Sequence, residues 1–154
     1  MKKTIAIVGA TEKNGKEIVM KLASIPYRLL LISNELTELD RLKNDLSLKH
    51  PHAETEALDC IKDGCWEADI IILTVAPEAK REVAERIKEV ATQKIVVNVF
   101  NSKDNSPELK KILPYSKLVG VSGNFSELKI HGGDTTVNEE IQQIFNLAGF
   151  NLAQ

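Results

Sequence analysis

The residues with the clearest chemical meaning form a short loop after the first apolar run of the chain. This glycine loop, residues 9–15, reads Gly9-Ala10-Thr11-Glu12-Lys13-Asn14-Gly15. It leads directly into an amphipathic stretch, so its end coincides with the N-terminus of a predicted helix. The free N–H groups and the dipole of a helix N-terminus favour an anion, above all a phosphate. The glycine loop therefore predicts a phosphate-binding turn.

The spacing within the loop separates two kinds of nucleotide site. A Walker A loop has four residues between its glycines and ends Gly-Lys-Ser/Thr, whereas five residues separate Gly9 from Gly15 and Glu17 follows Lys16. No hydroxyl is thus placed for Mg²⁺. The variant G-x-T-G-x-x-G of NAD(P)-binding turns fits at Gly9, Thr11 and Gly15. We interpret the loop as dinucleotide-binding, with a simple strand-to-helix turn as the alternative.

One position of the loop departs from that pattern. Glu12 stands where the variant has its middle glycine, which lets the backbone approach the pyrophosphate closely. A carboxylate there adds bulk and a repelling charge, unless its side chain points to solvent. The sequence leaves open whether Glu12 weakens binding or abolishes it.

The end of the second predicted strand should contact the adenosine ribose. An acid there selects NAD, and a basic group accommodates the 2′-phosphate of NADP. The chain has Ser33 and Asn34 at this place, and the absence of an acid at Ser33 favours NADP, with NAD possible. Arg41 is the nearest candidate cation, and a solvated charge on a helix face is the equal alternative.

Other chemistry has little support in the sequence. The spacing of Cys60 and Cys65 fits neither a zinc site nor a redox C-x-x-C, so we interpret both as reduced structural thiols. His50 and His52 flank a proline in a polar turn and are expected to be solvated. The two tyrosines, Tyr27 and Tyr115, lack a lysine four residues later, as an acid–base tyrosine of a short-chain dehydrogenase would require.

Composition limits the class of protein. The 154 residues are 43% hydrophobic and 27% charged, which suits one globular domain over 1–154. A formal charge of −2 gives no basic field for nucleic acid or an anionic membrane. The longest apolar run is far shorter than the about 20 residues that span a bilayer, and no signal-peptide pattern follows Met1. We therefore expect a cytoplasmic protein without nucleic-acid or membrane partners.

The elements that position the loop alternate between short apolar runs and amphipathic stretches. Strands are predicted at 4–8, 29–32, 55–58, 70–75, 94–100 and 118–121. Helices are predicted from Gly15, from a cap at Asn34, near 61–66, from Pro77, and between Asn138 and Gly149. Apolar runs without polar alternation indicate strands covered on both faces. The order predicts an α/β fold, a doubly wound, mostly parallel sheet of the Rossmann-like NAD(P)-binding kind.

Taken together, these motifs resemble the NADP-binding domain of the deazaflavin-dependent (coenzyme F-420) NADP oxidoreductases and the related pyrroline-5-carboxylate reductases. The resemblance rests on the glycine loop, the run 68–77, the strand 96–100, Gly133-Asp134 and 148–150. Asn34 departs from the family, which has an arginine after the serine, and Glu38 stands at the family's next basic position. The likeness stops before the family's last helices, which complete the second-substrate site and the dimer.

The resemblance implies positions for the cofactor. Residues of the glycine loop would face the pyrophosphate, Ser33 and Asn34 the 2′-phosphate, and Val75, Ala76 and Pro77 the nicotinamide. Asn98 and Asn101 would lie near the reacting ring.

Two functions remain in competition. The first is an NADP(H)-dependent oxidoreductase that moves a hydride to an unidentified acceptor, held between subunits of a possible homodimer or by a partner. Segment 112–115 and the sheet edges are open as dimer contacts. The second is a catalytically silent dinucleotide-binding or interaction module, such as a redox sensor or subunit.

Overall fold

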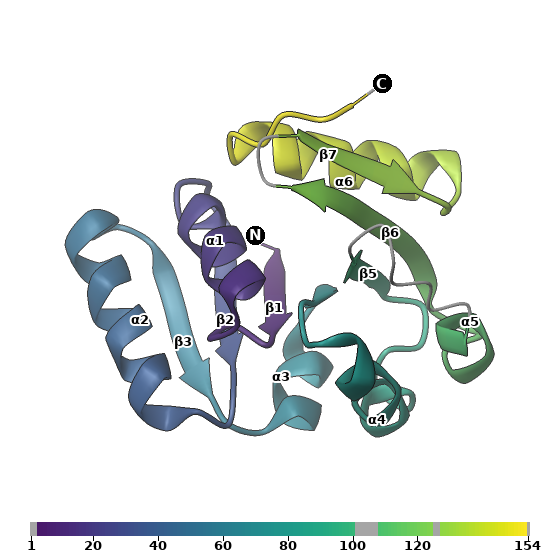
Figure 1. Cartoon of the computed structure of the whole chain (residues 1–154), viewed down its shortest axis with the longest axis horizontal. Coiled ribbons are helices and arrows are strands. Elements are labelled where there is room, and N and C mark those ends of the chain that lie inside the picture. The colour runs from purple at the N-terminus through teal and green to yellow at the C-terminus, as the bar shows by residue number, and fades with distance from the viewer. Residues whose placement is uncertain (1–2, 101–107, 125–126, 154) are drawn as a thin grey trace.

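The protein folds around one seven-stranded sheet with helices on both faces (Figure 1). The computed structural model describes residues 3–100, 108–124 and 127–153. The strand order is β3-β2-β1-β4-β5-β6-β7, and only the last pair, β6 with β7, is antiparallel. The order reverses between β1 and β4, which is where ligands bind in open α/β sheets. The predicted doubly wound α/β fold is confirmed.

Short strands alternate with helices along most of the chain. The strands are β1 (Thr4–Val8), β2 (Arg28–Ile32), β3 (Glu54–Leu58), β4 (Ile70–Leu73), β5 (Ile95–Phe100), β6 (Lys117–Asn124) and β7 (Glu127–His131). The helices are α1 (Lys13–Leu22), α2 (Leu36–Lys49), α3 (Ile61–Glu67), α4 (Pro77–Ile87), α5 (Glu108–Ile112) and α6 (Thr135–Leu147). None of these described helices is both long and apolar enough to cross a membrane.

Two apolar cores lie on opposite faces of the sheet. Alternate strand residues, such as Ile5 and Ile7 of β1, pack with α1, α2 and α6 in one core. Their neighbours Ala6 and Val8 pack with α3, α4 and α5 in the other. Every residue of β1 and β4 is buried, which explains why these strands read as continuous apolar runs.

Two predicted helix boundaries are wrong, and both errors concern asparagine. Glu35, not Asn34, is the N-cap residue of α2, because the Ser33 hydroxyl accepts the Glu35 N–H and Asn34 lies outside the helix. The last helix begins before Asn138: Asp134 is its N-cap and accepts the Val137 N–H at 2.9 Å. Asn138 lies inside α6.

The sheet differs from the prediction at two further places. β4 ends at Leu73, because the chain turns at Thr74 toward α4. The antiparallel strand β7 follows β6, and the sequence analysis did not predict it. Its residues Leu128 and Ile130 pack on the core that contains α6. In Figure 1, α6 runs beside β7 at the top of the view.

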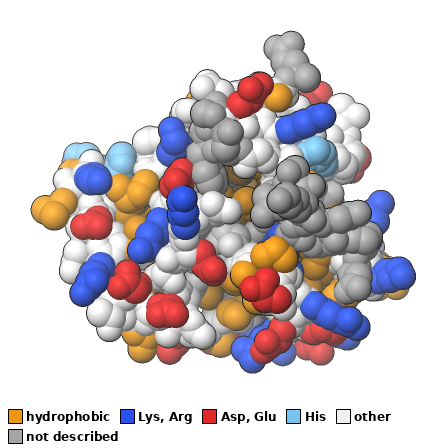
Figure 2. All heavy atoms as spheres, viewed as in Figure 1, with side chains coloured by type: hydrophobic (Ala, Val, Ile, Leu, Met, Phe, Trp, Pro, Cys, Tyr) orange, Lys and Arg blue, Asp and Glu red, His pale blue; other side chains and the backbone are white. Residues whose placement is uncertain are grey.

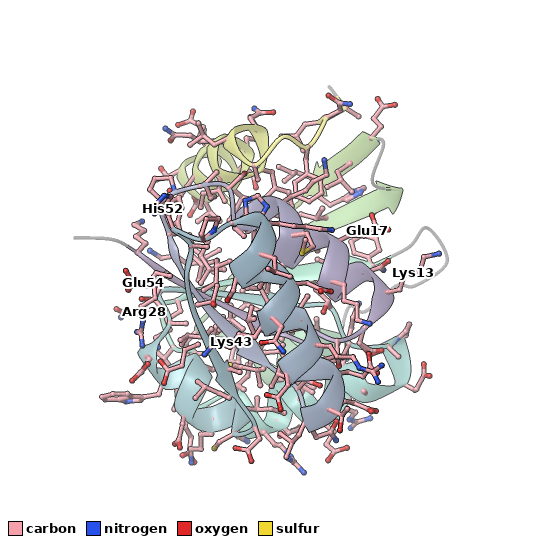
Figure 3. The ribbon with its side chains drawn as sticks, turned by 90° about the vertical axis from the view of Figure 1, so that its left-hand side faces the viewer. Lys13, Glu17, Arg28, Lys43, His52 and Glu54 are labelled. Carbon is pink, nitrogen blue, oxygen red and sulfur yellow. The ribbon has the colours of Figure 1, made fainter. Side chains whose placement is uncertain are left out.

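An ion-pair cluster joins β2, β3 and α3 away from the glycine loop. Arg28 of β2 lies 2.7 Å from Glu56, 3.4 Å from Glu67 and 3.8 Å from Glu54. Figure 3 shows Arg28 and Glu54 beside one another at the edge of the molecule. Because four charges form one network, the cluster helps fix β3 to the sheet more than an isolated surface pair would.

The two thiols are predicted to differ in reactivity. Cys60 is exposed and Cys65 is buried, and burial raises the pKa of the Cys65 thiol to about 12. The thiolate is the reactive form. We expect a thiol reagent at pH 8 to modify one cysteine quickly in the native protein and the second only after unfolding.

Cys60→Ser is the control and should remove the fast-reacting thiol from the native protein. Because the folded state raises the pKa of Cys65, its contribution to stability is complete below the unfolded pKa and falls as pH rises toward 12. Two rapidly modified thiols in native protein would contradict the burial of Cys65.

Candidate functional site

The glycine loop leaves β1 through a backbone turn that glycine favours. Gly9 has φ of 91°, a left-handed value that other residues rarely adopt. The N–H groups of Gly9 and Ala10 both donate to the Ile32 carbonyl, at 3.0 and 3.1 Å. The loop is therefore tied to the end of β2 as well as to β1.

Gly15 permits a close approach between α1 and the strand ends. A Cβ atom on Gly15 would lie 2.1 Å from the Gly9 carbonyl oxygen and 2.9 Å from Thr74 Oγ1. Thr74 Oγ1 itself lies 2.9 Å from the carbonyl oxygens of both Val8 and Gly9. Both glycines thus have a packing role, and this packing aims the first turn of α1 across the carboxyl ends of β1 and β4.

The N-terminus of α1 offers backbone donors to an anion. The first helical hydrogen bond runs from the Lys16 N–H to the Glu12 carbonyl, at 2.8 Å, so the N–H groups of Lys13, Asn14 and Gly15 precede it. Glu12 is the N-cap residue, and its side chain makes no capping bond. Its φ of −71° is ordinary for any residue, so glutamate causes no backbone strain here. Its carboxylate is exposed.

The Ser33 hydroxyl is already engaged by protein groups. It lies 2.6 Å from the Thr11 hydroxyl and accepts the Glu35 N–H at 3.0 Å, and Ser33 is 8% exposed. This contact fixes the glycine loop against the start of α2. Ser33 therefore acts chiefly as a positioning residue, which connects the glycine loop to the start of α2.

Two pockets lie on either side of the glycine loop. The larger, of about 630 Å³, extends toward the end of β2, where Ser33, Asn34 and Glu38 line it. The smaller, of about 170 Å³, extends toward the end of β5, where Lys80, Val99 and Phe100 line it. Glu12, Val75 and Ala76 line both pockets. An extended ligand could therefore lie across the glycine loop with one part in each pocket.

Most of the predicted binding residues meet at this edge. Those lining the larger pocket are Gly9, Thr11, Glu12, Ser33, Asn34, Val75 and Ala76, and those lining only the smaller are Lys13, Asn14 and Pro77. Gly15 lines neither pocket, because it is buried under the loop. Figure 3 shows Lys13 at the N-terminus of α1, with its side chain projecting away from the body of the protein.

The two asparagines predicted beside the reacting ring have different outcomes. Asn98 lies within β5 and lines neither pocket, and its buried Oδ1 has no hydrogen-bond partner among the described residues. Asn101 lies outside the described residues.

The sequence analysis missed Lys80, a buried cation in the smaller pocket. Lys80 is 2% exposed and donates to the Val99 carbonyl at 2.7 Å, which ties α4 to the end of β5. Its spacing from Val83, Ala84 and Ile87 gives the signal that could have found it, because these positions share one helix face.

The larger pocket is strongly acidic. Of the described residues that line it, five are acidic and one, Arg86, is basic; the acids are Glu12, Glu35, Glu38, Asp59 and Glu82. Arg86 is itself paired with Glu82 at 2.9 Å. Figure 2 shows acidic side chains interspersed with basic and apolar ones over the face of the molecule that is turned to the viewer. An anionic ligand must therefore depend on backbone donors and on cations just outside the pocket lining.

Across the described part of the chain, no cluster of three or more His, Cys, Asp or Glu side chains is arranged to hold a metal ion.

Sequence comparisons find reductases among the relatives. No family model matches the chain. The NADPH-dependent reductase BacG of Bacillus subtilis is 26% identical over 141 residues, covering 80% of this chain and 54% of that protein. A very-long-chain 3-oxoacyl-CoA reductase of Aspergillus niger is 35% identical over 52 residues, covering 34% of this chain and 15% of that protein. The chain thus spans about half of the length of BacG and a smaller part of the length of the 3-oxoacyl-CoA reductase.

Solved structures share the fold at low sequence identity. A Plasmodium falciparum pyrroline carboxylate reductase with NADP bound has a TM-score of 0.73 at 14% identity, covering 99% of this chain and 58% of that one. A proposed F-420-dependent NADP reductase from Arthrobacter has a TM-score of 0.71 at 14% identity, covering 96% and 82%. The (S)-3-hydroxybutyryl-CoA dehydrogenase of Ralstonia eutropha has a TM-score of 0.78 at 12% identity, covering 99% and 62%. The Rossmann-like fold of reductases and dehydrogenases is therefore shown.

The packing at Gly15 predicts a measurable loss of stability on adding one methyl group. In Gly15→Ala the new Cβ would overlap the Gly9 carbonyl oxygen, and overpacking of this kind costs about 1–3 kcal/mol. We expect the free energy of unfolding, measured by denaturant titration, to fall by that amount. Lys13→Ala, at an exposed position in the same helix, should change it by less than about 0.5 kcal/mol. Equal stability of the two variants would contradict the close contact.

Proposed function

We propose that this chain binds a nicotinamide dinucleotide, NADP(H) with NAD(H) possible, as the cofactor of an oxidoreductase. The observation that carries the proposal is the pair of pockets that meet at Glu12, Val75 and Ala76 beside the N-terminus of α1. The glycine packing supports it further, since it brings backbone donors to the point where the strand order reverses.

The residues around the two pockets fit a dinucleotide in one orientation. The N–H groups of Lys13, Asn14 and Gly15 would receive the pyrophosphate. Asn34, at the larger pocket, would face the adenosine ribose and its 2′-phosphate. Val75, Ala76 and Pro77 would flank the nicotinamide, with Asn98 near the reacting ring. The NADP-bound Plasmodium reductase and the NADPH-dependent BacG support this choice of cofactor.

A bound nicotinamide supplies the hydride in such a reaction, and the chain supplies position and environment. Thr74 and the two glycines hold the loop rigidly, so a ligand bound across it would be oriented without rearrangement. Lys80 holds the end of β5 at the wall of the smaller pocket. The acceptor of the hydride is unassigned, and the proposal includes a homodimer or a partner protein that contributes to its site.

The silent binding module is the second function in competition. Its motivation is Glu12 in the loop and the acidic lining of the larger pocket, both of which oppose an anion. The oxidoreductase has the broader support, because the relatives and structural neighbours described above are reductases and dehydrogenases.

Nucleotide binding gives the first test. A ligand present at 100 times its dissociation constant stabilises a protein by about 2.7 kcal/mol. We therefore expect NADPH or NADH at millimolar concentration to raise the melting temperature, measured by calorimetry. Absence of a shift with both nucleotides would overturn the proposed function. If binding is found, oxidation of NADPH with a flavin or deazaflavin acceptor above background would exclude the silent module.

The Glu12 carboxylate is predicted to weaken binding by charge. Glu12→Gln removes the charge and keeps the bulk, whereas Glu12→Gly removes both. Because a carboxylate near a phosphate repels it, we expect both variants to lower the dissociation constant of NADPH about tenfold at low salt. Isothermal titration calorimetry would measure the change.

Glu17→Gln is the matched control, because Glu17 lies on the same helix but lines neither pocket. Figure 3 shows it along α1, beyond Lys13. A gain in Glu12→Gly alone would assign the effect to bulk. No gain in either variant would mean that the Glu12 side chain points away from the ligand.

A further inference from the structure

We propose that Glu38 governs the choice between a dinucleotide with a 2′-phosphate and one without, by holding the two nearest cations, Lys16 and Arg41. This inference rests on the proposed function, because it concerns how the same site selects its cofactor. It assigns to Glu38 a role as a specificity-determining residue.

One carboxylate occupies both cations at once. Lys16 Nζ of α1 lies 3.3 Å from Glu38 Oε2, and Arg41 of α2 lies 3.2 Å from Glu38 Oε1. The arrangement joins two helices through the two oxygens of a single side chain. Glu38 therefore stands where a phosphate with several oxygens could take the same two partners.

Glu38 lies where the phosphate of a bound dinucleotide could replace it as the partner of Lys16 and Arg41. Glu38 lines the larger pocket together with Thr11 of the glycine loop and with Ser33 and Asn34, which directly follow β2. The ribose of an adenosine is expected at this place in the fold. A 2′-phosphate there would lie on the same side of the pocket as the Lys16–Glu38–Arg41 group.

Two other polar side chains that line this pocket already have protein partners. The Ser33 hydroxyl is shared between Thr11 and the Glu35 N–H. Arg86, the cation on the opposite wall, is paired with Glu82. Lys16 and Arg41 are therefore the nearest cations that a 2′-phosphate beside Asn34 could use, and Glu38 competes with the phosphate for both.

A phosphate could replace Glu38 as the partner of Lys16 and Arg41, because these ion pairs are partly exposed to solvent. The side chains of Lys16 and Glu38 are 43% and 38% exposed, and that of Arg41 is 71% exposed. Pairs of this kind contribute little to stability and can rearrange around a ligand. The displaced carboxylate nevertheless stays near the phosphate and repels it, so Glu38 opposes the phosphorylated cofactor selectively.

Glu38→Gln tests this directly through two binding constants. We expect the dissociation constant for NADPH to fall about tenfold at low salt, because both cations are freed and one repelling charge is removed. The dissociation constant for NADH, which lacks the phosphate, should change less than twofold. Raising the salt concentration should reduce the NADPH gain, since the interaction is between solvated charges.

Two further variants separate a local effect from a general one. Glu35→Gln removes a carboxylate that lines the same pocket but pairs with neither Lys16 nor Arg41, and it should shift the NADPH-to-NADH ratio by clearly less than Glu38→Gln does. Adding Lys16→Met to Glu38→Gln should remove much of the gain. All variants should melt near the wild-type temperature without ligand, because the substituted side chains are partly exposed.

The outcomes separate this inference from the proposed function. A selective gain for NADPH in Glu38→Gln that depends on Lys16 supports the role of Glu38. An equal change for both nucleotides, or no change while binding persists, overturns the role of Glu38 and leaves the dinucleotide site intact. If wild type and variant bind neither nucleotide, both proposals fail.

Discussion

The contact on which the site depends is the approach of Gly15 to the Gly9 carbonyl, with Thr74 closing the same space. No side chain fits between α1 and the loop, since a Cβ at Gly15 would lie 2.1 Å from the carbonyl oxygen. Thr74 uses the volume that the two glycines leave and bonds to the end of β1. Three elements, β1, α1 and β4, are thereby held at fixed distances where the strand order reverses. Both pockets exist because the loop is fixed in this position between them.

The second feature of the site is an electrostatic balance. The N-terminus of α1 attracts an anion, whereas the larger pocket carries five carboxylates and one arginine. The carboxylates do not act alike, however. Glu82 is neutralised by Arg86 within the pocket wall, and Glu38 by Lys16 and Arg41 at its margin. Glu12, at the junction of the pockets, makes no capping bond, so its charge acts on whatever crosses the loop. Affinity for a dinucleotide depends on how these groups rearrange around it.

The sequence predicted the fold and most of the residues that line the two pockets, and the errors in the prediction have identifiable causes. Buried strands and amphipathic helices leave a period in the sequence, so β1, α1 and α4 were predicted close to their observed bounds. Caps leave a weaker signal, because asparagine, serine and aspartate compete for the same role. Asn34 is not the N-cap of α2, because the Ser33 hydroxyl accepts the Glu35 N–H and Glu35 caps the helix instead. Asp134, not Asn138, is the N-cap of α6. Strand β7 was missed because its side chains alternate between the α6 core and the opposite face, which gives no continuous apolar run.

The sequence by itself determined that β1 ends in a glycine turn opening a helix, and that the strands are buried on both faces. Both are local properties, written in residue type and period. Only the tertiary structure decided which distant groups share a pocket. Ser33 meets Thr11, and Glu38 meets Lys16, across 22 positions of the chain in each case. Lys80 meets the end of β5 because α4 packs there. Contacts of this kind depend on the order of the strands and on the packing of the helices. They set the charge and the shape of the site.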